Sequence, residues 1–274
     1  MIRMNIYSIA SLLAFITGLG FGLFVFIKSR SVQNRIFSIA CVLTGIWCLF
    51  PFLASIASSE SSAIFYARIT YIFASLSVPV WLKFMFAVIN KSNKKILIAS
   101  YIFSSFFILV YSNHLFIKGV NRFAPHFSII PGPLYALFII YFGSVFLYIL
   151  SNFFKKIKRS SGYKKSQYTY LSVGFCFGIL GGITHFLTAY TNKEFIPHDF
   201  AVIGYTLIFV YSIIKHRLLD IKVALTRTTI FIAVYTLVLG IPFWVGYITR
   251  SWLLSTSVAV GFATAGPSIY NYLR

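Results

Sequence analysis

Long apolar stretches alternate with short polar segments along almost the whole chain. A helix needs roughly 20 residues to cross the hydrocarbon core of a bilayer, and the apolar stretches recur at about that length. Most of these stretches are unbroken runs of apolar residues, whereas the strands of a membrane barrel alternate apolar and polar residues. This pattern favours helices. The sequence therefore predicts an all-α, polytopic transmembrane helix bundle with nine spans. These are Ile6–Ile27, Ile36–Ala57, Ile69–Ile89, Ile96–Tyr111, Pro133–Phe154, Tyr170–Tyr190, Ala201–Ile214, Ile230–Ile248 and Leu253–Tyr270.

Composition agrees with this pattern. Hydrophobic residues make up 59% of the 274 residues and charged residues only 10%, whereas a soluble domain is about 45–50% apolar and about 25% charged. A water-soluble protein of this size could not bury so much apolar surface, so the lipid bilayer is the expected solvent. The first span is too long for the core of a signal peptide, so we expect it to be retained.

The distribution of positive charge predicts an orientation. The formal net charge is +20, and 17 of the 24 Lys and Arg residues fall in segments 28–35, 91–95, 155–165 and 215–227 and at Arg274. The positive-inside rule places these segments in the cytoplasm, with the N-terminus outside and the C-terminus inside. Because the basic residues occupy short loops and form no separate domain, we expect no nucleic-acid partner.

Lys83 is the only cation well inside a predicted span. An ionisable residue within the membrane is by default a candidate for a ligand or ion pathway. Lys83 also lies only about one and a half turns from the cytoplasmic end of its span, and a lysine side chain can extend that far to reach water. Both interpretations are open.

Several polar residues fall towards the predicted outer side of the bundle. His114 follows the fourth span, His185 lies in the outer part of the sixth, and His198 and Asp199 lead into the seventh. His185 follows Gly182 by three residues, which places it on the glycine face of its helix and towards the bundle interior. These groups predict a site for a small polar ligand, with His114, His185, Asp199 and Lys83 as candidate residues. No closely spaced histidine pair is present, so we expect no metal.

Two glycine patterns predict close helix packing. Gly174, Gly178 and Gly182 are spaced by four along the sixth span, and Gly18 and Gly22 repeat the spacing in the first. Small residues at this spacing allow helix backbones to approach closely.

The segment 113–132 between the fourth and fifth spans is long for such a bundle and rich in apolar residues. It could lie in the membrane interface or fold over the mouth of the bundle, and the sequence favours neither.

Catalytic patterns are missing from the chain. It has no paired intramembrane carboxylates, no GxSxG, no HExxH and no phosphate-binding glycine loop. With only four acidic residues, metal-dependent phosphoryl transfer within this chain is not expected. We predict no enzyme activity and no cofactor.

The segment from Tyr211 and Ile213 through His216-Arg217-Leu218-Leu219-Asp220-Ile221 resembles a junction in bacterial sensor histidine kinases. In that family the junction ends an N-terminal seven-transmembrane region. Softer matches occur in the expected order: Trp47, Pro79 with Phe84, Asn113-His114, Gly132-Pro133-Leu134-Tyr135 and Gln167.

The resemblance implies a seven-transmembrane sensory bundle over residues 1–220 and a two-helix transmembrane hairpin over residues 221–274. It implies a multi-pass protein of the bacterial inner (plasma) membrane, a homodimer, and a cytoplasmic histidine kinase or output domain as partner. Arg217, Leu218 and Asp220 would relay the signal. This chain itself has no His-Glu phosphoacceptor motif and no nucleotide-binding boxes.

The sequence leaves two other classes open. A small-molecule transporter or channel would place charged groups and broken helices along a midplane path, for which Lys83 and the glycine-rich sixth span are the candidates. A scaffold or accessory membrane subunit would have no ligand of its own. Flux in proteoliposomes separates the transporter from a sensor.

Overall fold

The computed structural model describes residues 6–28, 31–123, 126–191 and 198–216, with residues 253, 256, 257 and 260. The chain divides into two units, Met1–Leu219 and Asp220–Arg274, and the helical bundle lies in the first. Arg217, Leu218, Asp220 and the eighth predicted span lie outside the described residues, as does nearly all of the ninth. The two-helix hairpin therefore stays a prediction.

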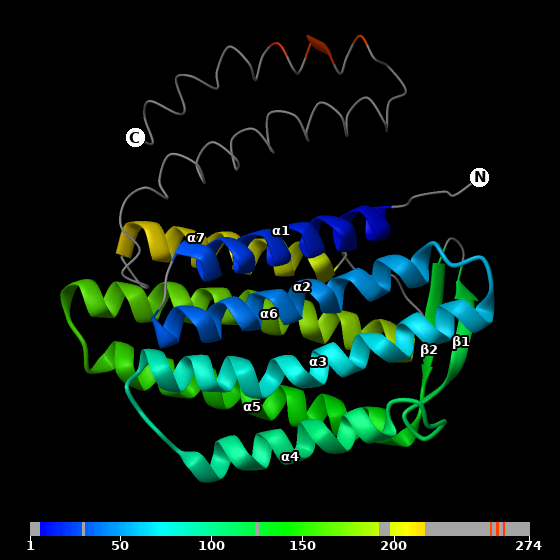
Figure 1. The fold of residues 1–274 in the computed structure, drawn as a ribbon, viewed down its shortest axis with the longest axis horizontal. Coiled ribbons are helices and arrows are strands. Elements are labelled where there is room, and N and C mark those ends of the chain that lie inside the picture. Colours follow the sequence, from blue (N-terminus) through cyan, green and yellow to red (C-terminus); the bar gives the residue numbers. More distant parts are fainter. Residues whose placement is uncertain are drawn as a thin grey trace. The chain divides into compact units, whose positions relative to one another are not determined.

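The described part of the first unit contains seven helices that run alongside one another (Figure 1). Five of them, α1, α2, α3, α5 and α6, are long and apolar enough to cross a membrane. The other two, α4 and α7, have 17 and 19 residues, at the lower end of the spanning range. The helices are α1 Ile6–Lys28, α2 Val32–Ser55, α3 Glu60–Val88, α4 Lys94–Val110, α5 Pro133–Lys158, α6 Gly162–Thr191 and α7 His198–His216.

Each of the first seven predicted spans corresponds to one of these helices, but several helices continue beyond their apolar stretch. The third span was expected from Ile69, whereas α3 begins at Glu60. Its N-cap is Ser59, whose side chain accepts a hydrogen bond from the Ser62 amide, and this satisfies one of the free N–H groups of the first turn. Polar capping residues therefore extend the helix beyond the apolar span. The count of nine spans and the orientation stay predictions.

The segment between α4 and α5 is the one β-structure among the described residues. Strands β1 Ile117–Phe123 and β2 His126–Pro131 form an antiparallel hairpin, in which Val120 pairs with Ile129. Val120 packs with Ala63 and Ala67 of α3, and the hairpin also contacts α2 and α6. The hairpin folds onto one end of the bundle (Figure 1), which agrees with one of the two alternatives for residues 113–132. Wholly α-helical structure was the expectation, and this hairpin is the exception to it.

The glycines of α1 lie at a close approach to α2, as predicted. A Cβ atom on Gly18 would lie 2.9 Å from the Gly45 Cα atom, and one on Gly22 would lie 3.0 Å from the Ser38 carbonyl oxygen. The Ser38 hydroxyl donates a hydrogen bond of 2.5 Å to the Gly22 carbonyl across the same contact. Glycine on both helices therefore brings the two backbones together.

The glycine stripe of α6 has a different role from the one predicted. Gly174 and Gly182 make room for aromatic side chains rather than for a helix backbone, since their nearest neighbours are the rings of Phe209 and Phe142. The close approach of α6 to α7 occurs instead at Gly181, where a Cβ atom would lie 2.8 Å from the Ala201 Cβ atom. The spacing of four indicated a packing face correctly, but it did not distinguish a ring from a helix as the partner.

Candidate functional site

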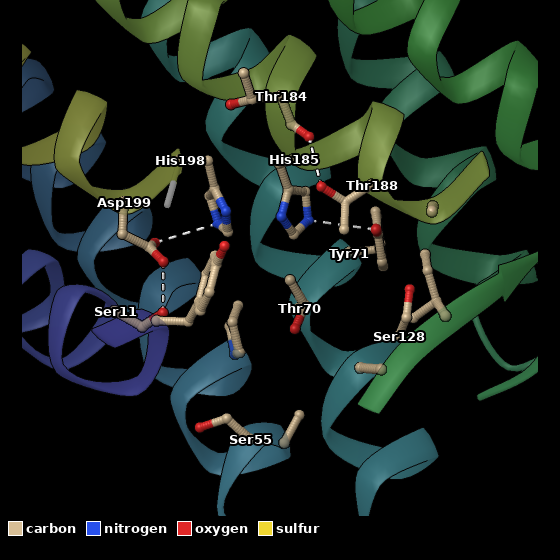
Figure 2. Close-up of a pocket in the computed structure, with 16 residues that line it drawn as sticks. Ser11, Ser55, Thr70, Tyr71, Ser128, Thr184, His185, Thr188, His198 and Asp199 are labelled. Carbon is tan, nitrogen blue, oxygen red and sulfur yellow. Dashed lines mark hydrogen bonds and ion pairs between the residues drawn. The ribbon is translucent and has the colours of Figure 1, made fainter. Parts of the chain in front are cut away.

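A pocket of about 130 Å³ lies at the end of the bundle covered by the hairpin. Its walls come from the start of α1, the end of α2, the start of α3, strand β2, the end of α6 and the start of α7. Figure 2 shows hydroxyl, imidazole and carboxylate groups from these elements converging on it. The side chains at its centre are Ser11, Tyr71, His185, His198 and Asp199.

Asp199 is the buried carboxylate of this pocket, in the first turn of α7 and 0% exposed. Its Oδ2 atom accepts a hydrogen bond of 2.5 Å from the Ser11 hydroxyl of α1. Its Oδ1 atom lies 3.2 Å from His198 Nε2 but is buried without a hydrogen-bond partner. The helix N-terminus favours a negative charge at this position. One carboxylate oxygen thus joins α7 to α1, while the other has an unfilled acceptor position.

The two histidines continue this polar group across the bundle. The ring centroids of His185 and His198 are 4.1 Å apart, and His185 Nε2 lies 3.4 Å from the Tyr71 hydroxyl. The Tyr71 hydroxyl lies 2.7 Å from the hydroxyl of Tyr135 on α5. A series of polar side chains therefore connects α7, α6 and α3 (Figure 2) and continues to α5 through Tyr135.

The pocket can hold a small polar molecule. Its acceptors include the free Asp199 Oδ1 atom, and the hydroxyl and imidazole groups can donate or accept. Within the described part of the chain, no group of three or more His, Cys, Asp or Glu side chains is placed to hold a metal ion. The arrangement offers hydrogen-bonding recognition of a small molecule.

The structure brings together two of the four candidate ligand residues. His185 and Asp199 both line the pocket. His114 is exposed, with Nδ1 3.2 Å from the Lys118 carbonyl oxygen, and it does not line the pocket. Lys83 is exposed on α3, five residues before that helix ends at Val88, and it also lies apart from the pocket.

Sequence reasoning passed over Ser11 and Tyr71, which complete the site. Ser11 lies in an apolar run with no motif around it, and Tyr71 is one of 18 tyrosines. A signal that could have identified Ser11 is its position on the same face of α1 as Gly18 and Gly22, at separations of seven and eleven residues.

Comparison with known families gives one match. The N-terminal 7TM region of histidine kinase matches residues 10–222, a range that includes α2 to α7 completely and most of α1. No curated protein and no solved structure matches the chain.

Proposed function

Because the chain belongs to the family of N-terminal seven-transmembrane regions of histidine kinases, we propose that its bundle detects a small polar ligand and reports it inward. The region is sensory rather than catalytic. In the proposed arrangement nine spans cross a bacterial inner membrane, with the N-terminus outside and the C-terminus in the cytoplasm. The chain forms a homodimer and acts on a cytoplasmic histidine kinase or output domain.

One observation carries this proposal: the Oδ1 atom of the buried Asp199 carboxylate accepts no hydrogen bond and has a 3.2 Å contact with His198 Nε2, while its Oδ2 atom binds Ser11 of α1. A buried acceptor without a partner is uncommon and needs an explanation. A ligand with an N–H or O–H group can supply the missing donor. It would thereby compete with, or reinforce, the bond that joins α7 to α1.

Helix α7 is suited to transmit such a change. It begins at the pocket and ends at His216, next to the family junction at Arg217, Leu218 and Asp220. Farther along, Phe209 packs against the rings of Trp81, Phe37 and Phe175. A displacement at the first turn of a well-packed helix is passed along its length, because helices move as rigid elements between discrete arrangements. The ligand drives this shift only if it binds the two arrangements with different affinity.

The size of the pocket limits the ligand. A volume of about 130 Å³ is several times the roughly 10–15 Å³ that a cavity needs to hold one water molecule. The polar lining and the free carboxylate oxygen favour a small molecule with an amine or hydroxyl group over a large apolar one.

The experiment measures autophosphorylation in membrane vesicles with a histidine kinase domain attached after the bundle. We expect Asp199→Asn and Ser11→Ala to shift the basal kinase level and to weaken regulation. The matched control is Thr17→Ala, because the Thr17 hydroxyl bonds only to carbonyls of its own helix. Unchanged output from both site variants, or from a chimera in which an unrelated membrane anchor replaces the bundle, would overturn the proposal.

The features that suggested a transporter do not support that alternative. Lys83 lies on an exposed face of α3, and Gly174 and Gly182 of α6 accommodate aromatic rings. Solute flux through proteoliposomes that contain the purified chain would restore the transporter interpretation.

A further inference from the structure

A second cavity, of about 650 Å³, lies at the opposite end of α3 from the ligand pocket. It is formed by the α3–α4 connection, the last turns of α5 and the first turns of α6. Five cationic side chains line it and no acidic side chain does. They are Lys91, Lys155, Lys156, Arg159 and Lys164.

The backbone holds Lys91 in place at this cavity. Asn90 adopts a left-handed conformation with φ of 50°, and the Lys91 amide donates a 3.0 Å hydrogen bond to the Phe86 carbonyl. This is the geometry of a Schellman cap, which ends the helix and fixes the direction of the chain beyond it. Lys91 therefore leaves α3 at a defined angle.

A buried amide orients the side chain of Lys91. Lys91 Nζ donates a 3.1 Å hydrogen bond to Asn152 Oδ1 on α5, and Asn152 is only 6% exposed. Asn152 Nδ2 in turn donates to the Tyr148 carbonyl at 2.8 Å, which sets the orientation of the amide. The ammonium group is thus held at the cavity by a polar contact rather than extending freely into water.

Among the residues that the structure describes, no acidic side chain lies at this cavity. In the residues that the structure describes, the one ion pair between side chains joins His198 and Asp199 at the other end of the bundle. Glu60 is also at that end, because it begins α3. Cations gathered in a cavity without carboxylates raise the local concentration of anions, and the N-terminus of α6 beside them adds its own partial positive charge.

The surroundings of the cavity indicate the source of the anion. Phe154 and Tyr163, next to lining residues in the sequence, each leave 47% of their surface exposed, and aromatic residues favour the level of the lipid headgroups. Basic pockets between transmembrane helices on the cytoplasmic side suit anionic lipid headgroups. We propose that this cavity binds a phosphate group, and that an anionic phospholipid of the inner leaflet supplies it. This inference does not depend on the sensor function proposed above, but it rests on the orientation in that proposal, which places this end of the bundle in the cytoplasm.

Native mass spectrometry of the purified full chain in detergent, with phosphatidylglycerol or phosphatidylcholine added, tests the proposal. The site variant is Lys91→Gln with Lys156→Gln. The matched control is Lys94→Gln with Lys95→Gln, because these two exposed lysines lie at the same end of the bundle and do not line the cavity. Both variants lose the same charge, so the comparison separates a site from general attraction.

We expect wild type to bind phosphatidylglycerol at least tenfold more tightly than phosphatidylcholine. The affinity of the site variant for phosphatidylglycerol should fall roughly 25-fold, since each cation near a membrane surface contributes about fivefold. The affinity of the control variant should fall less than threefold. Equal losses in both variants would overturn the site. Inorganic phosphate that binds wild type as tightly as the lipid, with the same dependence on Lys91, would overturn the lipid as source.

Discussion

Replacing Ser11 with alanine tests the contact that joins α1 to α7. The substitution removes the hydroxyl that donates to Asp199 Oδ2 over 2.5 Å. Ser11 is 3% exposed and Asp199 is 0% exposed, so water does not readily replace the lost donor. The Oδ1 atom has no hydrogen-bond partner either. The carboxylate would then retain the nearby His198 imidazole, at 3.2 Å, and its contact with the Cys48 thiol.

The expected cost follows from the charge of the group that is left unpaired. Leaving a buried polar group without its partner costs about 1–3 kcal/mol, at the upper end for a charged one. A hydrogen bond between neutral side chains inside a membrane protein contributes on average about 0.6 kcal/mol. We therefore expect Ser11→Ala to lower the free energy of unfolding by about 2 kcal/mol.

Ser8→Ala is the matched control for this measurement. Ser8 lies one turn earlier on α1, is 1% exposed and shares a 2.7 Å hydrogen bond with the hydroxyl of Ser55. Because both partners are neutral, we expect a loss of only about 0.6 kcal/mol. The two variants differ mainly in the charge of the partner.

The assay is reversible unfolding in mixed micelles with increasing dodecyl sulfate, followed by tryptophan fluorescence. A double-mutant cycle of Ser11→Ala with Asp199→Asn isolates the energy of the contact. If Ser11→Ala costs no more than Ser8→Ala, or if the two substitutions of the cycle are additive, an ionised carboxylate does not join α1 to α7 and the reasoning is refuted.

Three further outcomes are expected. Gly45→Val should lower the free energy of unfolding by about 1–3 kcal/mol in the same assay, because its Cβ would lie 2.8 Å from the backbone of α1. Gly20→Val, with no atom within 4 Å of its Cβ position, should lower it much less. Equal effects of the two substitutions would contradict the α1–α2 contact. Tyr71→Phe should cost about 1 kcal/mol, because it leaves a buried hydroxyl on α5 without its 2.7 Å partner; an unchanged unfolding midpoint would contradict this. In a background without the three native cysteines, a membrane-impermeant maleimide should label Leu115→Cys in intact cells and Lys94→Cys only after permeabilisation; the reverse pattern would refute the predicted orientation.

The family and the helical bundle could be predicted from the sequence because both depend on local or regularly spaced features. Apolar length identified the regions of all seven described helices, and the junction at Arg217–Ile221 led to the family that matches residues 10–222. Helix ends were less accurate, since caps such as Ser59 extend a helix beyond its apolar stretch. The hairpin was missed because its strands are short and depend on packing against α3 for their burial.

The candidate site could be predicted only in part. His185 and Asp199 stood out because imidazole and carboxylate groups are rare in apolar spans. Lys83 was chosen for the same reason and His114 for its place on the predicted outer side, but neither lines the pocket. Residue type alone does not indicate which face of a helix meets its neighbours, and Lys83 lies on an exposed face of α3.

Hydrophobic length and a short junction motif are local features of the chain, and they were enough to predict a membrane bundle of the histidine kinase sensor family. The folded arrangement was needed to show which side chains meet at the pocket. The contact between Ser11 and Asp199 joins residues 188 positions apart, and Lys91 meets Asn152 across 61. Such pairs leave no periodic signal, because they depend on the relative rotation of packed helices.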